Sequence, residues 1–251
     1  MKKGFQFQNW IRHFEENAYR KDDIGWNDDY QLTRSEKKAV AESIRQFQRG
    51  ESGEGKYIFQ NAKQFVKQCT DDSYLYALEL FIHEEHRHAT YLAKFMGQQS
   101  IPKIKEHWVD NVFRWLRHHG NLEVSITVLV TAELFSSIYY RALAKATRSK
   151  CLQEICERIL HDEDLHIHFQ SFALNRIQRK RNPLLNFYMR FNHKVLLLGT
   201  MPVVWFFHRN VFKAGGYNLI RFMAESFIAY DELNTIVKAS DKQLLQLEQA
   251  W

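Results

Sequence analysis

Two short stretches of the sequence pair a carboxylate with an imidazole at a spacing suited to metal binding. Glu85 and His88 are three residues apart, and so are Glu163 and His166. On a helix this spacing places the two side chains on one side, about one turn apart. A single such pair is common by chance, so its repetition is what predicts a site.

A further glutamate precedes each pair on what the pattern predicts to be a separate helix. Glu54 lies 31 residues before Glu85, and Glu133 lies 30 residues before Glu163. The nearly equal intervals predict two helix pairs related by pseudo-symmetry. One inward glutamate from each of two helices, with Glu-x-x-His from the other two, forms a di-metal centre in four-helix bundles.

The composition predicts an all-α protein around this centre. The 251 residues include only three prolines and ten glycines, so long helices are rarely interrupted. We expect an N-terminal helix and loop at 1–32, a four-helix bundle at 33–182 and a C-terminal helical extension packed on it at 183–251. Within the bundle the predicted helices span about 34–69, 73–98, 122–146 and 150–181, with a crossover containing a short helix between the second and third.

The first of these helices offers two acids for the site. Glu51 and Glu54 both fall on an apolar stripe that also contains Val40, Ile44 and Ile58. Equal spacing in the two halves favours Glu54 as the ligand. Glu51, one turn away, is kept as the reserve.

Four carboxylates that converge in a helical core need a partner. An unpaired buried carboxylate costs several kcal/mol or takes up a proton. Two divalent cations would offset these charges, and mixed carboxylate and imidazole ligands suit iron or manganese. The alternative is that these side chains are solvated on the surface; the apolar stripes around Glu54 and Glu133 argue against it.

The first motif, residues 84–88 (Glu-Glu-His-Arg-His), resembles the (Asp/Glu)-Glu-x-Arg-His motif of ferritin-like di-iron carboxylate proteins. Residues 162–166 match it except that Leu165 replaces the arginine. The resemblance covers roughly residues 34–181. It implies a ferritin-like four-helix bundle with two iron ions as cofactor, and with manganese as an option in one site, but says little about 1–32 and 182–251, where the sequence pattern itself predicts the additional helices.

The resemblance also assigns roles to individual residues. It implies that Glu84 and Asp162 accept hydrogen bonds from the ligand histidines of the opposite half and that Arg87 pairs with one of these acids. Leu165 leaves the second half without an equivalent cation. The implied metal ligands, which are also the implied catalytic residues, are Glu54, Glu85, His88, Glu133, Glu163 and His166.

By the same resemblance the expected function is that of an oxygen-activating non-haem di-iron oxidase or oxygenase. O₂, a small and hydrophobic organic substrate and an external electron donor would be its partners. Iron oxidation and storage, or a non-catalytic helical protein that keeps metal for stability, are the alternatives. A homodimer is left open.

The net charge and the N-terminal sequence indicate which binding partners and which cellular location are expected. The net charge of +6 arises largely from a cluster at residues 176–181, a predicted helix end, so nucleic-acid binding is not expected. The N-terminal residues lack the apolar core of a secretory signal, so a cytoplasmic location is expected. We expect four further histidines near the motifs to lie at the surface or in a second layer rather than to bind metal; they are His83, His86, His161 and His168. Tyr91 and Tyr140 are expected to be either packed in the core or redox-active.

The C-terminal extension contains an apolar run at residues 195–207. Its 13 residues are too few to span a bilayer about 30 Å thick. We expect the run to cover the bundle and to form part of the substrate pocket, with Trp205 and Phe222 among its walls. Interfacial contact with anionic lipid is the alternative, because cations precede the run; these are Arg179, Lys180, Arg181, Arg190 and Lys194.

Overall fold

The computed structural model describes residues 6–20, 24–53, 55–69, 72–105, 120–179 and 181–248. These residues contain helices and no strand. The helices are α1 (Phe7–Tyr19), α2 (Arg34–Glu51), α3 (Lys56–Cys69), α4 (Ser73–Gln98), α6 (Leu122–Lys145), α7 (Lys150–Gln178), α8 (Pro183–Ala214), α9 (Leu219–Lys238) and α10 (Asp241–Glu248). The crossover helix expected between 98 and 120 falls largely on residues 106–119, which lie outside the described ranges.

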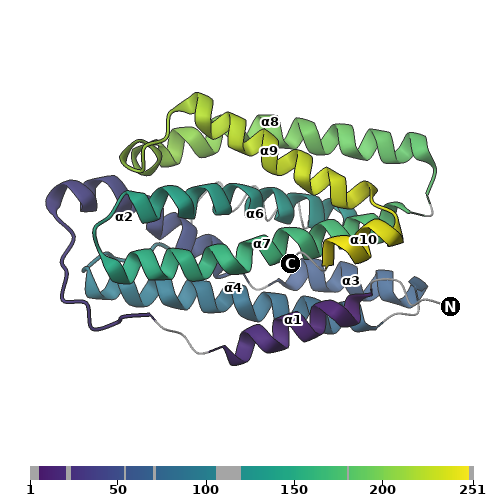
Figure 1. Cartoon of the computed structure of the whole chain (residues 1–251), viewed down its shortest axis with the longest axis horizontal. Coiled ribbons are helices and arrows are strands. Elements are labelled where there is room, and N and C mark those ends of the chain that lie inside the picture. The colour runs from purple at the N-terminus through teal and green to yellow at the C-terminus, as the bar shows by residue number, and fades with distance from the viewer. Residues whose placement is uncertain are drawn as a thin grey trace.

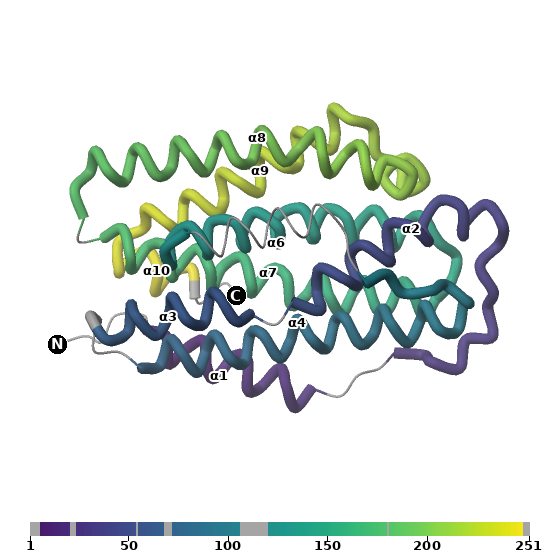
Figure 2. The backbone as a smooth tube through the Cα atoms, turned by 180° about the vertical axis from the view of Figure 1, so that it is seen from behind, coloured from purple at the N-terminus to yellow at the C-terminus, as the bar shows by residue number. Residues whose placement is uncertain are grey.

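The helices form a bundle with an added layer on one side (Figures 1 and 2). α6 packs along α7 and α2 along α4, while α3 continues the direction of α2 and contacts α4 and α6. α1 lies across α4, and α8 and α9 cover α6 and α7 on the opposite side. The predicted all-α bundle with additional helices at both ends is confirmed.

Side-chain caps begin the helices where the sequence places polar residues. Thr33 and Glu36 form a capping box at the start of α2. Asn121 caps α6 and Ser149 caps α7 through their side-chain oxygens. These caps fix the ends of the helices that hold the site.

The prediction of one helix over 34–69 is wrong, because the chain breaks between α2 and α3. Gly55 has φ +60°, and a Cβ there would lie 2.4 Å from Cδ1 of Ile82 on α4. Only glycine combines this left-handed backbone with so close an approach. Glu51 therefore ends α2, and Glu54 lies outside the described residues.

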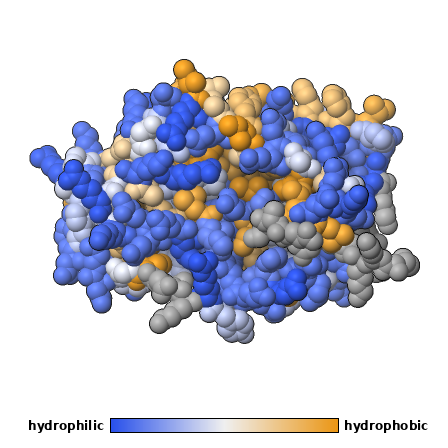
Figure 3. Space-filling model, in the orientation of Figure 1, coloured by the Kyte–Doolittle hydropathy of each residue, from blue (hydrophilic) through white to orange (hydrophobic). Residues whose placement is uncertain are grey.

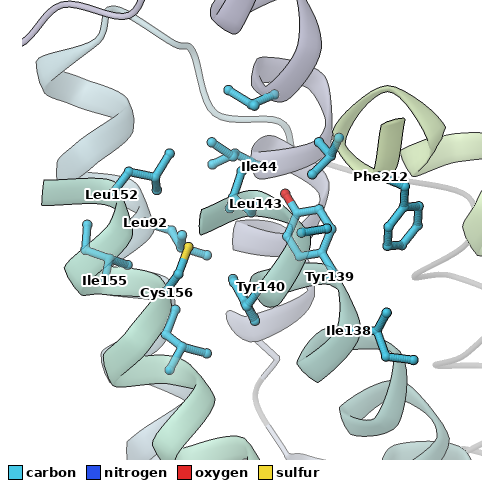
Figure 4. Close-up of a cluster of buried hydrophobic side chains, with 14 of the residues drawn as sticks. Ile44, Leu92, Ile138, Tyr139, Tyr140, Leu143, Leu152, Ile155, Cys156 and Phe212 are labelled. Carbon is cyan, nitrogen blue, oxygen red and sulfur yellow. The ribbon is translucent and has the colours of Figure 1, made fainter. Parts of the chain in front are cut away.

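The core divides into two hydrophobic clusters along the bundle axis. One contains Ile44, Leu92, Tyr139 and Ile155, and Figure 4 shows how these side chains converge. The other lies nearer to α1 and contains Trp10, Phe81, Ile126 and Phe169 among its members. Between the clusters each bundle helix contributes polar residues, so the polar site is enclosed by apolar side chains on both sides.

The C-terminal helices pack on the bundle, but not as a roof over the site. A Cβ on Gly215, in the turn after α8, would lie 2.3 Å from the carbonyl oxygen of Ala142 on α6. The backbone of this turn is therefore in direct contact with the backbone of the bundle. The pocket that reaches the site is lined by no residue after 183. The expectation that Trp205 and Phe222 form its walls is therefore wrong; both pack in the cluster of Ile44 and Leu92.

Candidate metal centre

Both motif histidines are completely buried, and the Nε2–H of each ring donates a hydrogen bond to an acid of the opposite motif. His88 Nε2 lies 3.0 Å from Asp162 Oδ2, and His166 Nε2 lies 3.0 Å from Glu84 Oε2. An ionised carboxylate only accepts, so the proton of each neutral ring sits on Nε2. The lone pair of each Nδ1 is therefore directed to the space between the helices, as a metal ligand requires.

Four carboxylates line the same space as the two Nδ1 atoms. His166 Nδ1 is 3.1 Å from Glu85 Oε1, and His88 Nδ1 is 3.7 Å from the same oxygen. His88 Nδ1 is also 3.9 Å from Glu51 Oε2. Three groups have potential ligand atoms within 4.8 Å of one another: Glu85, His88 and His166; Glu51, His88 and Glu163; Glu133, Glu163 and His166.

Two carboxylates are central to this arrangement. Glu163 belongs to two of the groups, and Glu85 is close to both histidines. Carboxylates in such positions can bridge two cations, while Glu51 and Glu133 lie at the two flanks. The geometry thus offers two adjacent positions, each with a terminal carboxylate and one imidazole.

Several of these atoms are buried without a hydrogen-bond partner, which is the property expected of metal ligands before metal is bound. They are Glu85 Oε1, His88 Nδ1, Glu133 Oε1, both carboxylate oxygens of Glu163 and His166 Nδ1. Six unsatisfied polar atoms in one place are costly for a core. Two cations would satisfy all of them, so the residues present fit a di-metal centre.

The crowding of carboxylates also shifts their proton affinity. Burial, reinforced by the charges of Glu133 and Glu51, raises the pKa of Glu85 to about 8. Burial is the main cause that raises the pKa of Glu133 and of Glu163 as well. Burial opposes protonation of His88, but its hydrogen bond with Asp162 and the nearby Glu51 prevail and raise its pKa to about 9.

Glu51 occupies the place for which the sequence favoured Glu54. It is buried, and the Tyr140 hydroxyl donates a hydrogen bond of 2.6 Å to its Oε1, which leaves Oε2 directed to His88. Burial and the charge of Glu51 raise the pKa of Tyr140 well above its usual value, so the phenol keeps its proton. Glu54 was favoured because its 31-residue distance to Glu85 nearly equals the 30-residue distance in the second half. That comparison assumed one continuous helix, whereas α2 ends at Glu51 and α3 begins at Lys56.

A ring of hydrogen bonds holds the two acids behind the histidines. Arg87 lies 3.0 Å from Glu84 and 3.5 Å from Asp162, so it pairs with both acids rather than with one. Asn17 of α1 donates to Glu84 at 2.5 Å and to Asp162 at 2.8 Å. Arg158 donates to the Asn17 side-chain oxygen at 2.7 Å and lies 3.6 Å from Asp162.

Sequence reasoning missed Asn17 and Arg158. Arg158 supplies the second half with the cation that Leu165 does not provide, from one turn before Asp162. Asn17 continues the spacing of Trp10 and Phe14 on α1, so a polar residue on that apolar face was the available signal. His83, His86 and His161 are exposed, as expected, and His86 Nε2 lies 2.9 Å from the carbonyl oxygen of Gly53.

Comparison with known proteins identifies solved structures that share this fold. No family model matches the chain, and no curated protein matches it in sequence. Among solved structures, variants of an R2-like ligand-binding oxidase with an Mn/Fe cofactor are similar at 13–14% identity. Three of them have TM-scores of 0.66, 0.65 and 0.64, each covering 94% of this chain and 94% of the other. The chain therefore has the ferritin-like fold of those oxidases.

The Asn17→Ala variant tests the ring of hydrogen bonds. Loss of the amide removes one donor each from Glu84 and Asp162, so both histidines lose part of their orientation. We expect ferrous-iron affinity to fall about 10–100-fold while helicity is retained. Titration with a chromophoric chelator measures this, with Glu16→Ala on the exposed face of α1 as control. Unchanged affinity would show that α1 only covers the site.

Proposed function

We propose that this chain is an oxygen-activating non-haem oxidase or oxygenase with two iron ions, one position of which also accepts manganese. The observation that carries the proposal is the convergence of two buried Nδ1 atoms and four carboxylates, three of which have buried oxygens without a hydrogen-bond partner. The Mn/Fe cofactor of the similar oxidases supports the choice of metals.

The proposed metal ligands are Glu51, Glu85, His88, Glu133, Glu163 and His166. Glu85 and Glu163 are assigned between the two ions, and each histidine is assigned to a different ion. Glu54 remains a sequence-based alternative to Glu51, since it lies outside the described residues. When bound, two such ions supply the electrons that reduce O₂, and an external donor restores them.

The protein's own groups prepare this centre. Burial acts to raise the pKa of Asp162, but the hydrogen bond with His88 and the nearby positive charges prevail and hold that pKa below its usual range, so this acid stays ionised and fixes the His88 tautomer. Tyr140 holds its proton on the hydroxyl next to Glu51 and keeps that carboxylate in place. The two hydrophobic clusters exclude water from both ends of the site, which strengthens electrostatic interactions within it.

A pocket of about 230 Å³ leads to Glu51 and Glu85 through the break between α2 and α3. Ile58, Phe81 and Leu129 line it, and exposed Lys56 lies at its rim. Apolar walls that end at charged ligands suit a small hydrophobic organic substrate, which we propose as the substrate class. Gly53 and Gly55 are also among the residues that line it.

Anaerobic loading with ferrous iron followed by O₂ tests the reaction class. An oxidase consumes O₂ rapidly and keeps two iron ions per chain, even when more iron is offered. Storage predicts that iron well beyond two per chain is oxidised and retained as mineral. A scaffold predicts no O₂ uptake above that of free iron. Either of the last two results would overturn the proposal.

The Leu129→Trp variant tests the pocket. The indole would fill the passage next to Glu85, so turnover of small apolar alkyl and aromatic compounds should fall at least about tenfold. Metal content should stay at two per chain, because Leu129 is no ligand. Leu129→Met, which conserves volume, serves as the control. Equal turnover by the two variants would show that substrate enters elsewhere.

A further inference from the structure

The helix α8 exposes a continuous apolar stripe on the side that faces away from the bundle. Its members recur at steps of four and three residues from 184 to 198 and again eight residues later, so they lie on one face. They include Leu184, Tyr188, Phe191, Val195, Leu198 and Phe206, and Phe191 is 57% exposed. The stripe is about 33 Å long at 1.5 Å per residue. In Figure 3 hydrophobic residues gather along the upper edge, where Figure 1 draws α8.

The opposite face of α8 is the one that packs on the bundle. His193, Leu197, Thr200 and Met201 are buried there. Two helices in the described part of the chain are long and apolar enough to cross a membrane, α6 and α8. The relevant window of α6 is 78% buried, as in a core helix, whereas that of α8 is only 28% buried. Packing therefore accounts for the apolar character of α6 but not for that of α8.

The sequence interpretation of this segment needs two corrections. The apolar run of 13 residues is part of a helix of 32 residues. The bundle buries only one face of that helix. The helix can therefore cover the bundle with this face and contact another apolar phase with the opposite face. The neighbouring α9 extends the exposed surface with Ile220, which is 79% exposed, and Ile228.

The charge on α8 has one sign. The helix contains four cations and no aspartate or glutamate over its 32 residues. The cations are Arg190, Lys194, Arg209 and Lys213, and all of them except Arg190 are exposed. By helical periodicity Arg209 and Lys213 lie on the same side as the apolar stripe, near its end, and Lys194 lies at its flank. Long basic side chains beside an apolar stripe can keep their charges at headgroup level.

We propose that the α8 face, joined by the exposed apolar residues of α9, lies in the interface of an anionic lipid bilayer. A helix with an apolar side and only basic charges binds such a surface through buried area and electrostatic attraction. A second copy of the chain fits less well, because α8 contains no acid that could pair with the cations of another α8 face. Of the acids on α9, Glu225 is paired with Arg221, and the exposed Asp231 and Glu232 lie in the C-terminal half of the helix. This proposal does not depend on the proposed oxidase activity.

Flotation of the metal-loaded full chain with phosphatidylcholine vesicles, with and without phosphatidylserine, tests the proposal. We expect co-flotation with the anionic vesicles, weakened by salt. The Phe191→Gln/Leu198→Gln variant should lose it, because both substitutions remove apolar area from the exposed face. Tyr19→Gln/Tyr76→Gln, two exposed aromatics on α1 and α4, is the matched control and should float as the unaltered chain does.

A second variant examines the charge. Arg209→Gln/Lys213→Gln should weaken binding to anionic vesicles roughly 25-fold, since each cation near the surface contributes about fivefold. Absence of co-flotation at low salt, or equal binding to neutral vesicles, would overturn the proposal. So would a concentration-dependent dimer in sedimentation that only Phe191→Gln/Leu198→Gln disrupts, because the face would then belong to a second copy.

Discussion

The His166→Ala variant is expected to bind one metal ion per chain where the unaltered protein binds two. His166 provides the only imidazole of the group that contains Glu133 and Glu163, so this position would lose its nitrogen ligand. The loss should exceed the 10–100-fold effect typical of residues behind the ligands. Metal analysis after reconstitution and desalting measures the result.

The fold should survive this substitution. Glu84 loses its bond to His166 but keeps those to Asn17 and Arg87, so no acid is left unpaired behind the site. The control is His161→Ala on the same helix, whose side chain is exposed. Retention of two ions would contradict the ligand assignment. Joint loss of helical circular dichroism and metal would show that His166 acts as a structural residue.

Removal of metal should make the stability of the protein fall as pH rises. The pKa of Glu85 is raised from 4.5 to about 8 in the folded chain, so folding favours its protonated form. This contribution is complete below about pH 4.5 and is lost as pH rises towards 8. His88, with a pKa raised from 6.5 to about 9, loses its contribution between those values, in the same direction.

The expected loss in free energy of unfolding is about 3 kcal/mol or more between pH 5 and 9, since one unit of pKa shift corresponds to about 1.4 kcal/mol. The pKa values of Glu51 and Asp162 are lowered, so these acids are ionised throughout this window and add no slope. Urea unfolding in the presence of a chelator measures the effect.

The metal-loaded protein is the matched comparison. Metal ligands must be deprotonated, so metal affinity, and with it the stabilisation that metal provides, rises with pH. The two pH profiles should therefore diverge above about pH 5. A metal-free protein whose stability is flat or rises across this window would show that the carboxylates are not crowded as the structure has them.

Helical periodicity was sufficient to predict the bundle and to bring Glu85, His88, Glu133, Glu163 and His166 towards one space. These residues share the inward faces of long helices, and a helix fixes the direction of a side chain by its position alone. The acids behind the histidines followed from the motif, because they directly precede the glutamates in the sequence. Local spacing therefore carried most of the candidate site.

The parts that sequence did not predict depend on contacts between distant segments. The break at Gly55 arises from the approach of Ile82 on another helix, and no property of residues 50–55 alone distinguishes a break from a weak helix. Asn17 lies 145 residues from Asp162, so its bond becomes visible only when α1 is placed against the bundle. The same holds for Tyr140 and Glu51, 89 residues apart.

The central claim is that this cluster holds two metal ions between Glu85 and Glu163. Anomalous diffraction from crystals of the iron-loaded protein, at the iron edge, tests it most directly. We predict two peaks about 3.5–4 Å apart, one beside His88 and Glu51 and the other beside His166 and Glu133. A single peak, peaks outside this space, or Glu54 in the place of Glu51 would contradict the assignment.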